Sequence, residues 1–204
     1  MKMQRLCQLM LGSALSLLLN AAAWASHTYT INFAVDWIPN DWYVWVDGPK
    51  GGAPNSECME VWQVPDPLRG QIIEVNHHDG IAYSGYYPRY FTVQITDKND
   101  GFCWLKPKYN TWEFSLNSPR PKGGDDPPQV ILKGKVSFNH FWHQRGDDWR
   151  TYIETENTDG KGNPPYIGSA ICDDGIGFWQ DCLSAQVIGE DAADTIWIYF
   201  KYKP

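Results

Sequence analysis

The chain has 204 residues, of which 43% are hydrophobic and 15% aromatic, with 24 acidic and 17 basic side chains. Two basic and no acidic residues fall in the first 25 positions, so the other 179 residues (204 − 25) carry a formal charge of −9 (15 − 24). An acidic surface repels phosphate backbones, which excludes nucleic acid as an expected partner and leaves neutral ligands such as sugars open.

Residues 1–25 have the features of a secretory signal peptide. Lys2 and Arg5 precede an apolar run from Leu9 to Leu19, and Ala-Trp-Ala follows at positions 23–25. The apolar run is too short for a membrane span. We therefore expect a secreted or periplasmic protein with no transmembrane segment, in which residues 26–204 form a single domain.

The predicted strands share a hydrophobic period of two. Apolar and polar side chains alternate in residues 28–35, 90–96, 111–116 and 194–202, and Gly, Pro, Asn and Asp interrupt the chain between these segments. The apolar faces are Tyr29, Ile31, Phe33 and Val35; Phe91, Val93 and Ile95; Trp112, Phe114 and Leu116; and Ile196, Ile198, Phe200 and Tyr202. One apolar and one polar face is typical of an antiparallel sheet, so the sequence predicts an all-β antiparallel β-sandwich, or jelly-roll-like, fold.

A Pro- and Gly-rich stretch covers residues 117–129. We expect it to be a long loop at the edge of the sandwich. The alternative is a linker between two small domains.

The cysteines predict two disulfides. Cys7 lies in the expected leader, and four cysteines remain for an oxidising compartment. We pair Cys172 with Cys182, because they close a short loop, and Cys58 with Cys103, because both lie in segments with strand character. A four-cysteine zinc site is the alternative, which the absence of any C-x-x-C spacing disfavours.

Aromatic rings, planar donors and carboxylates are interleaved in residues 138–150. A sugar needs this mixture, because its C–H face stacks on an aromatic ring while its hydroxyls hydrogen-bond to polar groups. The candidate ligand-binding residues here are His140, Trp142, His143, Arg145, Asp148 and Trp149. Alternatively, Trp142 and Trp149 are core residues around a turn. His140 and His143 would share a metal in a turn, but on a strand they point to opposite faces.

Four further aromatic residues are candidates for ligand contact. Phe178 and Trp179 lie in the segment between Cys172 and Cys182, where a disulfide would fix them for insertion into a groove or a lipid interface. Trp197 and Tyr199 lie on the more polar face of the last predicted strand, where they would form a stacking platform. The alternatives are that the first pair caps the core and that the last strand is buried on both faces.

Metal and catalytic motifs are sparse. Oxygen-rich turns at residues 97–101 and 157–163 are candidates for calcium, but neither completes an EF-hand, and we expect no cofactor. No G-x-S-x-G, H-E-x-x-H or phosphate loop is present. Glu154 and Glu156 would share one face of a strand, as a carboxylate pair requires. His27 would chelate copper only if processing followed Ser26.

The sequence therefore predicts a secreted, non-enzymatic protein that binds a ligand through exposed aromatic residues. The favoured ligand is carbohydrate, that is, a glycan, and another cell-surface ligand comes second. One alternative is a polysaccharide-active enzyme, either a carboxylate-pair hydrolase or a copper-dependent oxygenase. Another is a secreted protein that contacts a membrane or a host surface.

Overall fold

The computed structural model describes residues 26–38, 42–47, 56–62, 71–74, 90–118, 129–157, 167–173, 177–189 and 193–202. The expected signal peptide and most of the Pro- and Gly-rich stretch lie outside these ranges. All regular elements of the described residues are strands. A search of these residues for a helix long and apolar enough to cross a membrane finds none.

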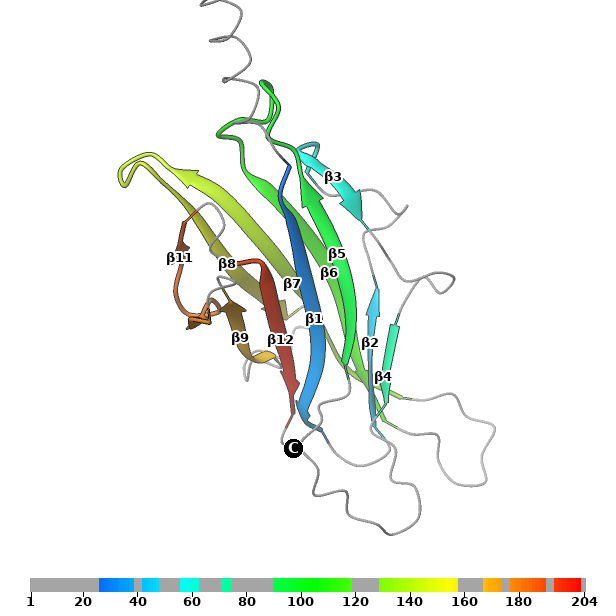
Figure 1. Cartoon of the computed structure of the whole chain (residues 1–204). Coiled ribbons are helices and arrows are strands. Elements are labelled where there is room, and N and C mark those ends of the chain that lie inside the picture. The colour runs from blue at the N-terminus through cyan, green and yellow to red at the C-terminus, as the bar shows by residue number, and fades with distance from the viewer. Residues whose placement is uncertain are drawn as a thin grey trace, which may run out of the picture.

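Twelve strands form two six-stranded sheets (Figure 1). In chain order they are β1 (Thr28–Trp37), β2 (Tyr43–Asp47), β3 (Met59–Trp62), β4 (Gln71–Glu74), β5 (Tyr90–Asp97), β6 (Lys108–Asn117), β7 (Val130–His143), β8 (Asp148–Asn157), β9 (Ile167–Asp173), β10 (Trp179–Asp181), β11 (Val187–Ile188) and β12 (Thr195–Lys201). The first sheet, sheet A, has the order β10-β9-β12-β1-β5-β3. The second, sheet B, has the order β11-β8-β7-β6-β2-β4.

The apolar faces of the strands meet between the two sheets. Tyr29, Ile31 and Phe33 of β1 are completely buried, and the ring of Phe33 lies edge-on to Trp112 of β6 with 5.3 Å between centroids. Each large apolar side chain buried in this way contributes about 1.5–3 kcal/mol. The predicted β-sandwich and the alternation of β6 and β12 are confirmed, and the predicted apolar face of β1 is buried, although Asn32 and Ala34 on its other face are buried as well. The side chain of Phe91 lies outside the described side chains.

The centre of sheet A contains one parallel pair of strands. β1 lies between β5, with which it is antiparallel, and β12, with which it is parallel. All other pairs in the described sheets are antiparallel, as the sequence predicts. A parallel pair needs a long connection instead of a hairpin, and the whole of strands β2 to β11 separates β1 from β12.

Both predicted disulfides are present. Cys58–Cys103 joins the residue before β3 to the loop after β5, with 5.3 Å between Cα atoms. Cys172–Cys182 joins β9 to the residue after β10, with 5.8 Å between Cα atoms. All four cysteines are buried, so each disulfide fixes a surface loop from beneath.

Candidate binding surface

Four aromatic residues lie on the face of sheet A that points away from the core. Strand alternation places Trp197 and Tyr199 opposite the buried side chains of β12. In the strand register, Ala34 of β1 lies between Tyr199 and Tyr90 of β5. Trp179 of β10 pairs with Asp173, which pairs in turn with Thr195 of β12. We call Tyr90, Trp179, Trp197 and Tyr199 the outer aromatic face.

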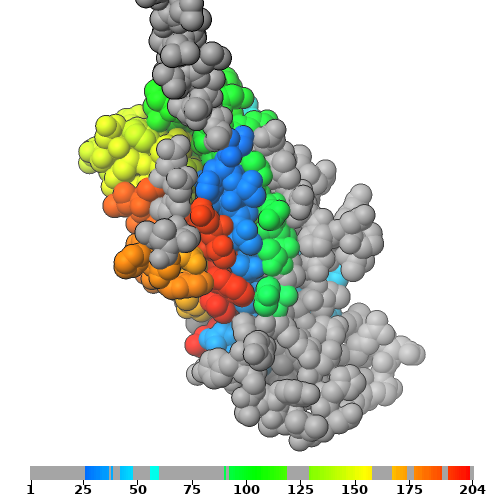
Figure 2. Space-filling model, viewed as in Figure 1, coloured from blue at the N-terminus to red at the C-terminus, as the bar shows by residue number. Residues whose placement is uncertain are grey.

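Trp197 contacts the rings of two of the other residues, Tyr90 and Tyr199. The rings of Trp197 and Tyr199 are stacked at 6.0 Å and 15°. Tyr90 reaches across β1 and meets Trp197 edge-on at 5.0 Å and 65°. Asn32 and Ala34, the residues of β1 between these rings, are both buried. Figure 2 shows β12, β1 and β5, the strands that carry the three rings, side by side at the molecular surface.

Trp179 extends this surface toward the edge of sheet A. Its side chain is 58% exposed, and that of the preceding Phe178 is 67% exposed. β10 and β12 are separated by two strand spacings, or about 10 Å. Because Cys172–Cys182 fastens β10 to β9, Trp179 is held on the same face as Trp197 instead of on a free loop.

Polar groups surround the aromatic patch. The hydroxyl of Thr92 donates to Asn32 Oδ1 at 2.6 Å, and Lys201 Nζ lies 3.1 Å from Asp36 Oδ2. Burial, together with the charge of Asp36, raises the pKa of Tyr199, so its phenol stays protonated at neutral pH. The surface therefore presents apolar ring faces, neutral hydrogen-bonding groups and the Asp36–Lys201 ion pair, and the strand register adds the carboxylates of Asp173 and Asp181 on the side of Trp179.

The structure divides the predicted cluster of residues 138–150 between the two faces of sheet B. His140 and Trp149 point into the sandwich, where their rings are stacked at 4.5 Å and 4°, and both are buried. Burial, and then the charges of Lys108 and His27, lower the pKa of His140 to about 3. The expectation of one exposed cluster is corrected here, because β7 and β8 are regular strands whose side chains alternate.

The remaining members of that cluster lie at the β7–β8 hairpin. Trp142 packs edge-on against Trp149 at 5.7 Å, and Arg145 is exposed in the turn. Asp148 Oδ1 lies 2.9 Å from Arg150 Nε, and this hydrogen bond lowers the pKa of Asp148. His143 Nδ1 lies 3.7 Å from the same oxygen. These residues belong to sheet B, so they do not share a surface with the outer aromatic face.

The oxygen-rich turn at residues 97–101 is occupied by protein donors. Asp97 pairs with Lys108, Asn99 accepts from the same lysine, and Asp100 accepts from the amides of Phe102 and Cys103. Residues 158–163 of the other turn lie outside the described residues. Across the described ranges, His, Cys, Asp and Glu side chains form no group of three or more that is placed to hold a metal.

The groups proposed for enzymatic activity lie apart from the outer aromatic face. Glu154 and Glu156 are exposed on β8, and Glu156 lies 3.8 Å from Lys135. The backbone nitrogen of His27 donates to Asp97 at 2.7 Å, and its ring lies 2.9 Å from Asp194. The backbone nitrogen and the imidazole of His27, the two groups that would bind copper, thus both face carboxylates.

Sequence reasoning missed four exposed aromatic residues, Tyr90, Phe102, Trp104 and Tyr109, the last of which is 41% exposed on β6. Tyr90 begins β5 and is 55% exposed. The sequence signal for it was its place on the polar face of this strand, opposite Phe91, Val93 and Ile95. Phe102 and Trp104 flank Cys103, and each is 61% exposed. Lys106 Nζ lies 3.0 Å above the centre of the Phe102 ring. Their signal was the same aromatic-beside-cysteine pattern that singled out Phe178 and Trp179.

The fold and its covalent links define a β-sandwich with two disulfides. Compared with protein-family models, with curated proteins and with solved structures, the chain finds no match in any of the three. Function is therefore inferred from the chemistry of the chain's own surfaces.

Proposed function

We propose that this is an exported carbohydrate-binding protein whose binding site is the outer aromatic face. The observation that carries the proposal is the contact among Tyr90, Trp197 and Tyr199 on the side of sheet A opposite the core. Tyr90 is exposed, and Trp197 and Tyr199 are half-buried. Aromatic rings held together on a rigid sheet supply apolar contact area at little cost in conformational entropy. A pyranose ring offers a matching C–H face.

The polar surroundings favour a neutral, hydroxyl-rich ligand. Thr92 and Gln94 of β5 lie beside the rings in register with β1, and the Asp36–Lys201 pair balances its own charge. The carboxylates of Asp173 and Asp181 on the same face disfavour an anionic ligand. The separation of Trp179 from Trp197, about two strand spacings, favours an oligosaccharide over a single sugar.

Export fits the covalent structure. Both disulfides are of the kind that forms and persists in an oxidising compartment. The expected signal peptide would direct the chain there.

The test is binding to a panel of insoluble and soluble polysaccharides, followed by affinity measurement on any that is retained. Trp197→Ala should weaken binding by about 2 kcal/mol, or about 30-fold, because it removes the central ring of the patch. Trp179→Ala should weaken binding to long oligosaccharides more than to short ones. Trp104→Ala is the matched control for Trp179→Ala, because the two side chains are 61% and 58% exposed and Trp104 lies on the loop after β5. Unchanged binding in folded Trp197→Ala, or retention on no polysaccharide, would reject the proposal.

A second candidate function, contact with a membrane surface, is favoured by the loop after β5. Phe102 and Trp104 project from a segment that Cys58–Cys103 fixes to the sandwich. Flotation with zwitterionic phosphatidylcholine vesicles tests it. Loss of flotation in Trp104→Ala but not in Trp197→Ala would support membrane contact, and no flotation of the parent protein would reject it.

A further inference from the structure

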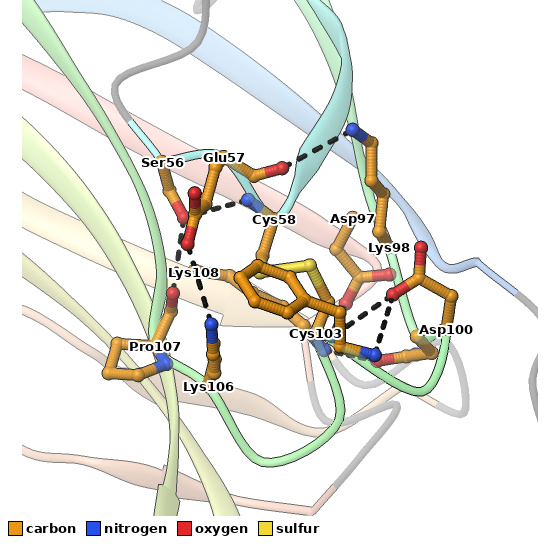
Figure 3. Close-up of a disulfide and its surroundings, with 12 residues drawn as sticks. Ser56, Glu57, Cys58, Asp97, Lys98, Asp100, Cys103, Lys106, Pro107 and Lys108 are labelled. Carbon is orange, nitrogen blue, oxygen red and sulfur yellow. Dashed lines mark hydrogen bonds and ion pairs between the residues drawn. A yellow bond between two sulfur atoms is a disulfide. The ribbon is translucent and has the colours of Figure 1, made fainter.

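Lys108, the first residue of β6, is fully enclosed at one end of the sandwich. Its side chain has no exposed surface, and its Nζ lies 3.1 Å from Asp97 Oδ2 and 4.1 Å from the centre of the Trp149 ring. The same nitrogen donates a hydrogen bond to Asn99 Oδ1. Figure 3 shows Asp97 and Lys108 beside the Cys58–Cys103 disulfide. A lysine is almost never this deeply buried in a folded protein.

The surroundings bring three reactive groups together in an enclosed space. Asp97 and Asn99 are themselves buried, and Asp97 also accepts from the amide of His27 at 2.7 Å and from the hydroxyl of Tyr29 at 3.4 Å. The site therefore holds an amine, a carboxamide carbon and a carboxylate able to carry protons. Burying two charges is costly, so a reaction that leaves neutral groups in their place is favoured.

We propose that Lys108 and Asn99 form an intramolecular amide bond between Lys108 Nζ and Asn99 Cγ, with Asp97 carrying the protons. A carbonyl carbon lies about 1.2 Å from its oxygen. Because Nζ already contacts Oδ1, it lies near the ~3–3.5 Å separation from which attack proceeds. Asn99 is the acyl partner because Asp97, held as a carboxylate by three donors, is a poor electrophile.

The reaction balances without a cofactor or an oxidant. Asp97 takes one proton from the Lys108 ammonium, and the lone pair of the neutral amine attacks Asn99 Cγ. Asp97 then gives its proton to Nδ2 and accepts a second proton from Nζ. The Cγ–Nδ2 bond breaks as the carbonyl re-forms. Ammonia leaves as a neutral molecule and Asp97 keeps the last proton, so the products are the amide, ammonia and a neutral Asp97 carboxylic acid.

The bond would lock the loop after β5 onto the start of β6, and the segment 99–108 that it closes contains Cys103 of the Cys58–Cys103 disulfide. Phe102 and Trp104 would then be displayed on a segment with two covalent links.

Mass spectrometry of the purified, reduced full-length protein tests the proposal. We expect a mass one ammonia lower than the processed sequence requires. Trypsin should not cut after Lys108, because its amine is acylated, so the peptide beginning at Asn99 should continue past Lys108. A measured mass equal to that of the processed sequence, together with normal cleavage after Lys108, would overturn the proposal. So would loss of water instead of ammonia, which would make Asp97 the acyl partner.

Variants separate this bond from succinimide formation, which also releases ammonia at asparagine. A succinimide leaves Lys108 open to trypsin and persists in Lys108→Met, and either result would overturn the proposal. We expect Lys108→Met and Asp97→Asn to keep the full mass. Lys106→Met is the matched control and should still lose ammonia. If the first two variants fail to fold, the peptide map of the parent protein decides the question alone.

Discussion

At the scale of single residues, the polar cluster around Lys108 is the least ordinary feature of the molecule. His140 lies within it, stacked on Trp149, and its Nδ1 is 2.8 Å from the hydroxyl of Thr151. The imidazole is neutral because burial and the positive charges of Lys108 and His27 all oppose its protonation. His140 is thus a neutral side chain in the same cluster as Lys108 and Asp97.

The buried neutral histidine should make the protein sensitive to acid. An unfolded histidine titrates near pH 6.5, whereas the pKa of His140 in the folded protein is about 3. Between these values the unfolded state binds more protons, so the free energy of unfolding falls as the pH falls. At pH 5 this one residue should account for a loss of about 2 kcal/mol.

Urea unfolding of the parent protein and of His140→Gln at pH 7 and pH 5 checks this expectation. The variant should lose less stability than the parent over that interval. His143→Gln, which alters a partly exposed histidine, is the control and should follow the parent. Equal losses in parent and His140→Gln would contradict the assignment.

At the scale of elements, close packing within sheet B has a measurable consequence at Gly134 of β7. A Cβ atom there would lie 2.5 Å from Cζ of the buried Phe114 and 2.8 Å from the backbone oxygen of Glu156. Gly134→Ala should therefore destabilise the protein by about 1–3 kcal/mol, as overpacking does. Gly146→Ala is a matched control, because its Cβ would meet only the ends of the partly exposed Asp148 and His143 side chains. Equal melting temperatures for both variants would contradict this account.

The two disulfides should differ in their effect on global stability. Cys58 and Cys103 are 45 residues apart, and Cys172 and Cys182 are 10 apart. Loop entropy in the unfolded chain then makes the first bond more stabilising by about 1.3 kcal/mol. Melting of the two double Cys→Ser variants checks the order. A lower melting temperature without Cys172–Cys182 would show that native packing, and not loop length, sets the difference.

Alternation along the chain predicted which faces of β1, β6 and β12 are buried, because that pattern is local. It also placed Trp197 and Tyr199 on an outer face. It could not predict Tyr90 as their neighbour, since Tyr90 meets Trp197 only through the order β12-β1-β5. Nor could the alternation show that His140 and Trp149 are buried, because aromatic residues occur on both faces of the β7–β8 hairpin.

At the scale of the whole molecule, β12 is necessary for the sandwich. Ile196, Ile198 and Phe200 are buried, and β12 pairs with both β1 and β9. Their combined burial is worth about 5–9 kcal/mol, comparable with the total stability of a typical domain. Deletion of Thr195–Lys201 should therefore abolish folding, as seen by loss of near-ultraviolet circular dichroism. The variant Trp197→Ser, changed only on the outer face of the same strand, should remain folded; a folded deletion variant would contradict this expectation.

The central place of β12 also sets the timing of folding. It is the last of the twelve strands to leave the ribosome, yet sheet A cannot close until β12 enters between β1 and β9. A growing chain therefore has no complete sheet A to fold, and pairings between such distant segments form slowly. Sheet A therefore stays open until β12, the last of the described strands, has been synthesised.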